Sequence, residues 1–444
     1  MSDPLEVLRR HSSRAAREFG VLETPPLWAR GEGATLWDER GVDYIDFTSG
    51  SAVSNAGHGN QAIRQAIEAQ LATGVFHTGT LVPSPQKARV IERIVSLAPP
   101  GLTRVHLAST GGEAVEVALK AVRYATGRQN VIAFWGGYHG RPMGALALTG
   151  FRSYRDPFYP VNIGAHHFAY PYPYRNPFGL PKEREEDILR LTLAYLEQAL
   201  DNPASGLAPV AAIFVEPVQG VGGMVVPPAG FLRGLRALCD RFGLLLVSDE
   251  IFCGFGRTGA WFGCQREGVT PDVMIVSKGL SGTLPVAGIV GTEAVMTAWP
   301  GGTQSSTFEG NPIACAAAVA SVDFLVQQDI LGNVRRTEDQ IRAWSQQIAG
   351  LPFVGEVRGV GAMWGIEIVE PGTTRPAPEL AKTLQSRCFE GGALVYRAGH
   401  YGNVLGLLPP LVATEQELAT GLARATVVLA DAAAGARHPL SAGG

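Results

Sequence analysis

The sequence predicts an α/β protein in which a large, mostly parallel sheet is joined to a smaller mixed α+β domain. Between about residue 100 and residue 330, short apolar runs alternate with helical patterns, as in consecutive βαβ units. Outside this stretch, apolar residues alternate around turn residues, as in antiparallel hairpins. The chain has 444 residues, 46% of them hydrophobic, which is enough for one large and one small domain.

Six strands of the large sheet are predicted from apolar runs, many of them rich in β-branched residues. In chain order these runs are "RVHLAS", "NVIAFW", "AAIFVEP", "LLLVSDE", "DVMIVS" and "AGIVG". A crossover helix is predicted in "GFLRGLRALCDRFG", where Leu232, Leu235, Cys239 and Phe242 share one face. Gly243 then supplies a left-handed stop before the next strand.

The smaller domain is predicted from both ends of the chain. Antiparallel pairs are expected in "ATLWDERGVDYIDF" and in "VGEVRGVGAMWGIEIV". A final helix is expected to begin with a capping box formed by Thr414 and Glu417. We therefore expect an N-terminal segment over residues 1–70 that packs with the small domain, a large domain over 71–330 and a small domain over 331–444.

One segment has no regular pattern. It reads "HHFAYPYPYRNPFGLPKEREED" and is too rich in proline and aromatic residues for a helix. We expect an ordered surface loop near a subunit contact or a pocket rim. Its adjacent histidines, His166 and His167, point in different directions and have no apparent third ligand, so no metal site is predicted.

Charge and composition argue against several kinds of partner. A net charge of −3 disfavours binding to nucleic acid or to an anionic membrane surface, because such binding requires clustered lysine and arginine. The five cysteines contain no CxxC pair, so neither a disulfide framework nor a zinc site is suggested. No apolar signal core and no membrane-spanning run is visible. We expect a cytoplasmic protein that acts on a small molecule.

Charged or aromatic side chains follow four of the predicted strands. Asp249 ends "LLLVSD", Glu216 follows "AAIFV", Tyr138 follows "NVIAFW" and Lys278 follows "DVMIVS". Each of them alone also fits a solvated strand end. In an open parallel sheet, however, ligands bind beyond the carboxyl ends of the strands. Four such residues in register therefore favour one shared crevice.

A possible seat for a phosphate group lies in "STGGEAVEVALKAVRYATG". It opens a helix with Thr110 as the N-cap, and Gly111 and Gly112 leave the first N–H groups bare, although a plain capped helix fits the same pattern. A phosphate seat, an aromatic residue, a carboxylate and a lysine together fit pyridoxal 5′-phosphate. Lys278 would form the Schiff base and then carry protons, and Asp249 would keep the pyridine nitrogen protonated.

The chain resembles a known family over nearly its whole length. The stretch "LLVSDEIFCGFGRTGAWFGCQREGVTPDVMIVSKGLSGTLPVAG" is similar to the signature of the class III pyridoxal-phosphate aminotransferases. The likeness extends from "GVDYIDFTSGSAVSNAGHGN" to "RGVGAMWGIEIV". It implies the fold type I architecture with a seven-stranded, mostly parallel large sheet. It also implies ping-pong transfer of an amino group between a small-molecule amine and a 2-oxo acid, and a homodimer or tetramer with active sites at the subunit interface.

The resemblance implies roles for single residues around the cofactor. Lys278 matches the Schiff-base lysine, and Asp249 matches the partner of the pyridine nitrogen. The other matching residues are Gly111 and Gly112 at the phosphate, Tyr138 and Ile251 on the two faces of the ring, and Thr307 at the phosphate of the neighbouring subunit.

The match to the family is less complete around the substrate. Glu216 matches an active-site glutamate, and Arg141 matches an arginine that can meet a substrate carboxylate. Many relatives bind the α-carboxylate with an arginine in the stretch that here reads "GNVLGLLPPL", where Gly406 takes its place. Arg397 could compensate, or it could be a solvated strand-edge residue. Ser51 replaces a glutamine of dialkylglycine decarboxylase, which disfavours decarboxylation.

Several functions remain open from the sequence. An aminotransferase, a decarboxylating aminotransferase and an epimerase or racemase would all use this cofactor, and a pyridoxal-phosphate-binding regulator is the alternative that is not an enzyme. We predict an aminotransferase whose donor is an ω-amino acid, a diamine, an amino sugar or an amino acid. His139 is interpreted as a structural histidine of the loop after Tyr138.

Overall fold

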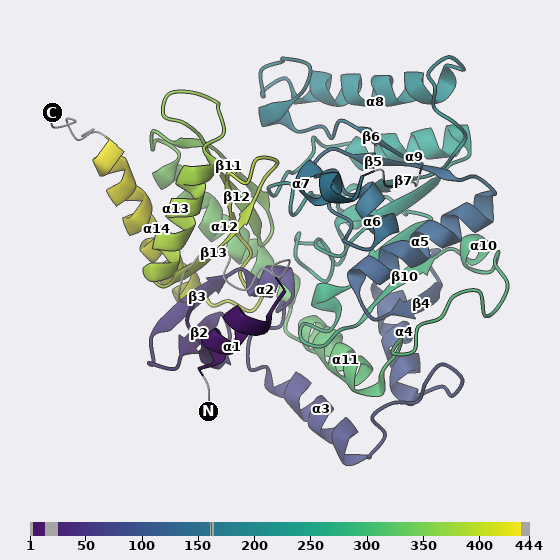
Figure 1. Cartoon of the computed structure of the whole chain (residues 1–444), viewed down its shortest axis with the longest axis horizontal. Helices are drawn as coiled ribbons and strands as arrows, with labels where there is room; N and C mark the ends of the chain where they lie inside the picture. The colour runs from purple at the N-terminus through teal and green to yellow at the C-terminus, as the bar shows by residue number, and fades with distance from the viewer. Residues whose placement is uncertain (1–2, 14–24, 160, 162–163, 437–444) are drawn as a thin grey trace.

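The computed structural model describes residues 3–13, 25–159, 161 and 164–436. The strands within these residues form two seven-stranded sheets that lie in separate lobes, the small one to the left and the large one to the right in Figure 1. The strand order is β4-β10-β9-β8-β7-β5-β6 in the large sheet and β1-β2-β3-β13-β14-β12-β11 in the small sheet. The predicted fold class is therefore confirmed.

The large sheet is parallel except for one strand. Strand β10 runs antiparallel to both of its neighbours, β4 and β9, and every other pair is parallel. The strands, in spatial order, are β4 (Arg104–Ala108), β10 (Ala287–Gly291), β9 (Val273–Val276), β8 (Leu245–Asp249), β7 (Val210–Val215), β5 (Asn130–Phe134) and β6 (Ala165–Phe168). All six predicted strands of this sheet are present.

Helices cover both faces of the large sheet, which explains why its strands are apolar on both sides. In β9, Val273 and Ile275 pack into the core beneath α5 (Gly111–Thr126). Met274 and Val276 pack into the core on the other face. That core also contains side chains from α3 (Gln61–Ala72), α4 (Pro85–Leu97), α9 (Phe231–Phe242) and α11 (Pro312–Gln327). In the sequence, the strands of a parallel sheet that is buried on both faces appear as continuous apolar runs.

The remaining elements are short or lie outside these layers. The other helices on the large lobe or the N-terminal segment are α1 (Pro4–His11), α2 (Ser49–Ala52), α6 (Met143–Leu148), α7 (Arg152–Arg155), α8 (Glu185–Asp201) and α10 (Glu293–Met296). Single 3₁₀ turns are η1 (Asp156–Phe158), η2 (Pro173–Arg175), η3 (Gly263–Glu267) and η4 (Lys278–Leu280).

The segment that begins at His166 differs from the prediction. Its first residues belong to β6, an edge strand that pairs with β5, so the expectation of a surface loop is wrong there. Tyr172, further along, is buried, and its hydroxyl donates a 2.7 Å hydrogen bond to Glu367 Oε2. A four-residue edge strand that reads Ala-His-His-Phe, with a proline three residues after its end, has too short an apolar run to be recognised from its pattern.

The small sheet combines both ends of the chain. Its strands, in spatial order, are β1 (Trp28–Glu32), β2 (Thr35–Asp38), β3 (Asp43–Phe47), β13 (Ala393–Ala398), β14 (Val404–Leu407), β12 (Met363–Ile368) and β11 (Val354–Val360). The two predicted hairpins, β2–β3 and β11–β12, are antiparallel as expected. The parallel pair β3–β13 joins the N-terminal strands to the C-terminal ones. The domain boundaries after residues 70 and 330 stay predictions.

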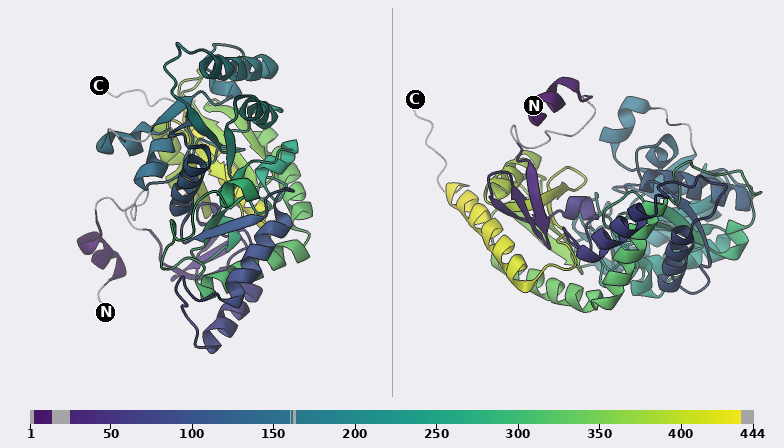
Figure 2. Two further views of the ribbon diagram at one scale, coloured as in Figure 1. Left: turned by 90° about the vertical axis from the view of Figure 1, so that its right-hand side faces the viewer. Right: turned by 90° about the horizontal axis from the view of Figure 1, so that it is seen from below.

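Three helices pack on the small sheet: α12 (Ile330–Ile348), α13 (Pro378–Glu390) and α14 (Glu415–Ala436). Seen from below in Figure 2, α14, α12 and α11 follow one another along one side of the molecule. The predicted capping box of α14 is present: Thr414 N–H donates to Glu417 Oε2, and Glu417 N–H donates to Thr414 Oγ1.

Helix α14 is long and apolar because one of its faces packs into the core of the small lobe. Among the described residues, it is the one helix that has, by itself, the length and mean hydropathy of a bilayer span. Its buried side chains, including Leu418, Leu422 and Leu429, lie in the core of the small lobe. The apolar face of α14 is therefore used in packing against the small sheet.

The two lobes are connected by a bend and by a buried arginine. Helices α11 and α12 meet at an angle of 69°. The fully buried Arg257 donates from Nη2 to Asn55 Oδ1 (2.6 Å) and from Nη1 to the carbonyl oxygens of Ala362 and Pro409. Burial lowers the pKa of Arg257 to about 9. This side chain ties together three segments that are distant in sequence, close to where the lobes meet.

A substitution at Gly243 tests the link between local sequence and fold. It ends α9 with φ of +63°, the left-handed conformation that the sequence predicts. We expect Gly243→Ala to lower the free energy of unfolding by about 1 kcal/mol, because a Cβ is strained in this conformation. Denaturant-induced unfolding measures the loss. Gly350→Ala is the matched control, since Gly350 is also exposed but lies outside the left-handed region and has open space around it. Equal losses in the two variants would contradict the explanation.

Candidate active site

A cavity of about 310 Å³ lies at the carboxyl edge of the large sheet. It contains every site residue predicted from the sequence except Ser51 and Thr307. The lining residues are Thr110, Gly111, Gly112, Tyr138, His139, Gly140, Arg141, Pro142, Glu216, Val221, Asp249, Ile251, Phe252, Ser277 and Lys278.

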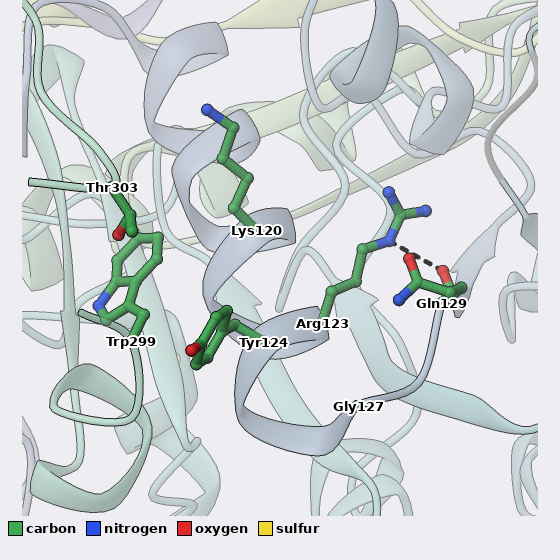
Figure 3. A pocket seen from close by; sticks show the side chains of 7 residues that line it. All are labelled: Lys120, Arg123, Tyr124, Gly127, Gln129, Trp299 and Thr303. Carbon is green, nitrogen blue, oxygen red and sulfur yellow. Dashed lines mark hydrogen bonds between the residues drawn. The ribbon is translucent and has the colours of Figure 1, made fainter.

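A larger hollow, of about 510 Å³, lies at the C-terminal end of α5 (Figure 3). Its lining includes two cations, Lys120 and Arg123, but no carboxylate. Both cations already have partners: Lys120 Nζ donates to Gln304 Oε1, and Arg123 Nε donates to the carbonyl oxygen of Gln129. The hollow contains none of the predicted site residues. The smaller cavity is therefore the candidate active site.

Four adjacent parallel strands deliver the reactive residues to the smaller cavity. Asp249 is the last residue of β8, and Glu216 directly follows β7. One residue separates Lys278 from the end of β9, and Tyr138 lies in the turn after β5. The strand order β9-β8-β7-β5 places these residues along one edge. This is the position at which open parallel sheets bind ligands.

Lys278 has both an unusual backbone and an altered acidity. Its φ is +46°, a left-handed value that is uncommon for a residue with a side chain and that is often found at functional sites. Its Nζ lies 3.9 Å from the ring centroid of Phe252. Desolvation lowers the pKa of Lys278 to about 8, although Asp249 and Glu216 act in the opposite direction. A larger share of the amine is therefore neutral near pH 7, as a lysine nucleophile requires.

Asp249 is held by a histidine whose role the sequence did not reveal. Asp249 and His139 are each 2% exposed, and His139 Nδ1 lies 2.7 Å from Asp249 Oδ2. The N–H of Ile251 donates to the other oxygen, Oδ1, at 3.1 Å. Burial acts to lower the pKa of His139, but the hydrogen bond and the charge of Asp249 raise it overall. The sequence interpretation treated His139 only as a structural residue of its loop. In the structure, His139 also contacts the carboxylate of Asp249. Its position directly after Tyr138, at the same sheet edge, was the available signal.

Glu216 is fixed by two backbone groups. The N–H of Tyr138 donates to Glu216 Oε1 at 2.8 Å, and the N–H of Gly220 donates to Oε2 at 3.0 Å. Burial raises the pKa of Glu216 to about 7, and the charge of Asp249 contributes in the same direction. This carboxyl group therefore changes charge near neutral pH while it remains in one place.

The position of Gly406 has no space for a side chain. Gly406 lies in β14, and a Cβ there would overlap Met224 Cε and lie 3.3 Å from Tyr396 Cβ. Met224 is fully buried and has a φ of +53°. An apolar side chain thus fills the space beside Gly406. Arg397 is not among the residues that line the cavity, whereas Arg141 is.

The start of α5 fits a phosphate group. The first N–H groups of a helix have no partner within it and point toward an anion placed at this end. A Cβ on Gly112 would lie 2.8 Å from Pro142 Cδ, and a Cβ on Gly111 would lie 3.1 Å from Ile251 Cδ1. Glycine at both positions keeps the backbone accessible from the cavity.

The rest of the lining fits the other parts of pyridoxal 5′-phosphate. Tyr138 and Ile251 offer an aromatic and an aliphatic surface for a flat ring. Asp249 offers a fixed carboxylate for the ring nitrogen, and Lys278 offers an amine for the aldehyde. The residues present therefore suit this cofactor.

Two predicted residues lie elsewhere. Ser51 is exposed in the short helix α2, with φ of +70°, and Thr307 is exposed in the loop before α11. Neither lines the cavity of a single chain. Their predicted roles stay predictions.

Comparison with known proteins identifies the family. Residues 20–429 match the family described as Aminotransferase class-III. The chain is 35% identical over 421 residues to the 5-aminovalerate aminotransferase of Pseudomonas aeruginosa, covering 94% of this chain and 96% of that protein. It is 35% identical over 432 residues to the 4-aminobutyrate aminotransferase of Escherichia coli, covering 95% and 97%. An amine transaminase from an uncultivated Pseudomonas species, solved in its PLP-bound form, matches with a TM-score of 0.86 and 29% identity, covering 95% of this chain and 98% of that chain. The chain belongs to the class III aminotransferases, a family of pyridoxal-phosphate-dependent transaminases with the type I fold.

Proposed function

We propose that this aminotransferase binds pyridoxal 5′-phosphate in the 310 Å³ cavity and uses Lys278 and Asp249 for amino-group transfer. The observation that carries the proposal is the convergence of Lys278, the Asp249–His139 pair and the start of α5 on this one cavity. When bound, the cofactor supplies an electron sink for the negative charge that forms on the donor carbon.

The residues of the chain then have separate tasks. Lys278 moves the proton between the donor carbon and the cofactor, since an amine with a pKa of about 8 can both accept and release a proton near neutral pH. Asp249, oriented by His139, would hold the ring nitrogen of the cofactor and favour its protonated form. Phe252 and Val221 are apolar parts of the lining and limit the access of water.

We also propose a homodimer in which each subunit completes the site of the other. Leu81 is 94% exposed and Phe308 is 64% exposed. The two segments that carry them are adjacent, because Asn311 Nδ2 donates to the carbonyl oxygen of Phe76, and the rings of Phe308 and His77 are 5.3 Å apart. Exposed apolar residues gathered in this way are typical of protein interfaces. Thr307 lies directly beside Phe308, so an interface there would carry Thr307 toward a neighbouring subunit.

A cytoplasmic location is part of the proposal. All five cysteines are free and buried. Free thiols suit a reducing compartment.

The proposed amino donor carries its reacting nitrogen on a primary carbon or on a sugar ring, as in an ω-amino acid, a diamine or an amino sugar. Two observations support this choice. Met224 rather than a guanidinium group fills the space beside Gly406, and Arg141 is the arginine that lines the cavity. The relatives named above act on 5-aminovalerate, 4-aminobutyrate and amines. A carboxylate at the far end of an ω-amino acid would meet Arg141. The 2-oxo acid acceptor would bind less tightly than it would to an additional arginine at position 406.

Replacing Lys278 tests the role of the lysine. Lys278→Ala should abolish transamination and the borohydride-reducible link between cofactor and chain, because no other lysine lines the cavity. Turnover assays and mass spectrometry after reduction measure the two effects. Lys120→Ala, which changes a lysine of the other hollow, is the control and should retain both. More than trace turnover by Lys278→Ala would sink the assignment.

Mixing two inactive chains tests the shared site. A Lys278→Ala chain and a Thr307→Ala chain should regain roughly a quarter of the wild-type activity when mixed, because half of the dimers are then mixed and one of their two sites is intact. Sedimentation of each variant checks that dimers form. An active monomer at the assay concentration would contradict the proposal.

Half-reaction kinetics test the choice of donor. The absorbance of the bound cofactor should change faster with 4-aminobutyrate, 5-aminovalerate or a diamine than with alanine or glutamate. Arg141→Ala should weaken turnover of ω-amino acids at least tenfold and spare diamines, because a charge-assisted contact to the carboxylate is lost. Arg397→Ala is the matched control. The proposal fails if a saturating α-amino acid reacts far faster than every ω-amine tested.

A further inference from the structure

The guanidinium group of Arg141 lies over an aromatic ring outside the cavity lining. Its Cζ is 3.9 Å from the ring centroid of Tyr154, a residue of the short helix α7. At this distance the cation is attracted to the ring face. Tyr154 does not line the cavity, so any effect that it has on a substrate passes through the residues that it contacts.

Stacking leaves the useful part of Arg141 accessible. A guanidinium group carries its five N–H donors in its own plane, and contact through the face leaves those donors free. A carboxylate binds in that plane, where two parallel hydrogen bonds can form. Tyr154 therefore occupies the surface of Arg141 that a substrate carboxylate does not need.

Tyr154 is itself held in place by other rings. It lies edge-on to Tyr138, with centroids 5.8 Å apart and an interplanar angle of 78°. It also contacts Phe151, at 5.6 Å between centroids. Phe151 in turn makes a T-shaped contact with His400, with centroids 6.4 Å apart and an interplanar angle of 88°. The ring that supports Arg141 thus belongs to a packed aromatic row that also touches Tyr138 in the cavity.

We infer that Tyr154 is a positioning residue that orients Arg141 and thereby favours donors that carry a carboxylate. The inference rests on the proposed function, in which Arg141 meets the carboxylate of an ω-amino acid. Arg141 is exposed, and a long exposed side chain loses rotational freedom when it binds a ligand. Stacking on a fixed ring restricts that freedom in advance, so less is lost when the carboxylate arrives.

The test compares two donors with the same number of carbons, 4-aminobutyrate and n-butylamine, on the holoenzyme. Tyr154→Leu should raise KM for 4-aminobutyrate roughly twofold to fivefold, the range expected for a lost cation–π contact at an exposed site, with little change in kcat. The half-reaction with n-butylamine, which has no carboxylate, should not change. Tyr154→Phe keeps the ring and should resemble the wild type. The inference is overturned if both donors are affected alike, if neither is affected, or if Tyr154→Phe is as defective as Tyr154→Leu.

Two further variants separate this inference from the function on which it rests. In an Arg141→Ala background, Tyr154→Leu should add no further increase in KM, because the two residues act as a unit. Tyr159→Leu, a change at a tyrosine that is 72% exposed in the same segment, should leave both donors unaffected. If Arg141→Ala itself leaves KM for 4-aminobutyrate unchanged, the proposed role of Arg141 fails. If Arg141→Ala raises KM but Tyr154→Leu does not, only the role of Tyr154 fails.

Discussion

The active site depends on one constraint: the parallel strands β9, β8, β7 and β5 all end at the same edge of the large sheet. Neighbouring strands are only about 4.8 Å apart, so residues that end them are brought within reach of one another whatever their separation in the chain. Lys278, Asp249, Glu216 and Tyr138 meet in this way. The helices on the two faces keep the strands buried and leave the edge as the place where polar groups gather.

The burial of these groups changes their acidity in a useful direction. Loss of water disfavours the charged form of both acids and bases. It therefore lowers the pKa of Lys278 to about 8 and raises the pKa of Glu216 to about 7, which brings both groups close to neutral pH. The two oxygens of Asp249 are held by His139 and by the N–H of Ile251. One cavity thus contains proton-exchanging groups beside a carboxylate that is fixed in position.

Gly406 and Met224 form a contact between the two lobes. Gly406 belongs to a strand of the small sheet, whereas Met224, which fills the space beside it, belongs to the loop after β7 of the large sheet. The buried Arg257 donates hydrogen bonds to carbonyl groups of the small lobe from within the large one, and so links the two lobes. Arg141 and Tyr154, by contrast, come from the large lobe alone. Every residue that lines the cavity likewise comes from the large lobe.

Periodicity and turn residues were sufficient to predict six strands of the large sheet, the two hairpins of the small one and the stop at Gly243. They also predicted that Asp249 and Lys278 converge. These features depend on neighbours in the chain or on where a strand ends. The four-residue strand β6 was missed because its pattern is too short. Contacts across the fold could not be predicted. His139 lies 110 residues from Asp249, and nothing local indicates that Met224 packs against Gly406 or that Tyr154 supports Arg141. Such pairs form only when packing brings distant segments together, since their geometry depends on the positions of whole elements rather than on the residues beside them in the chain.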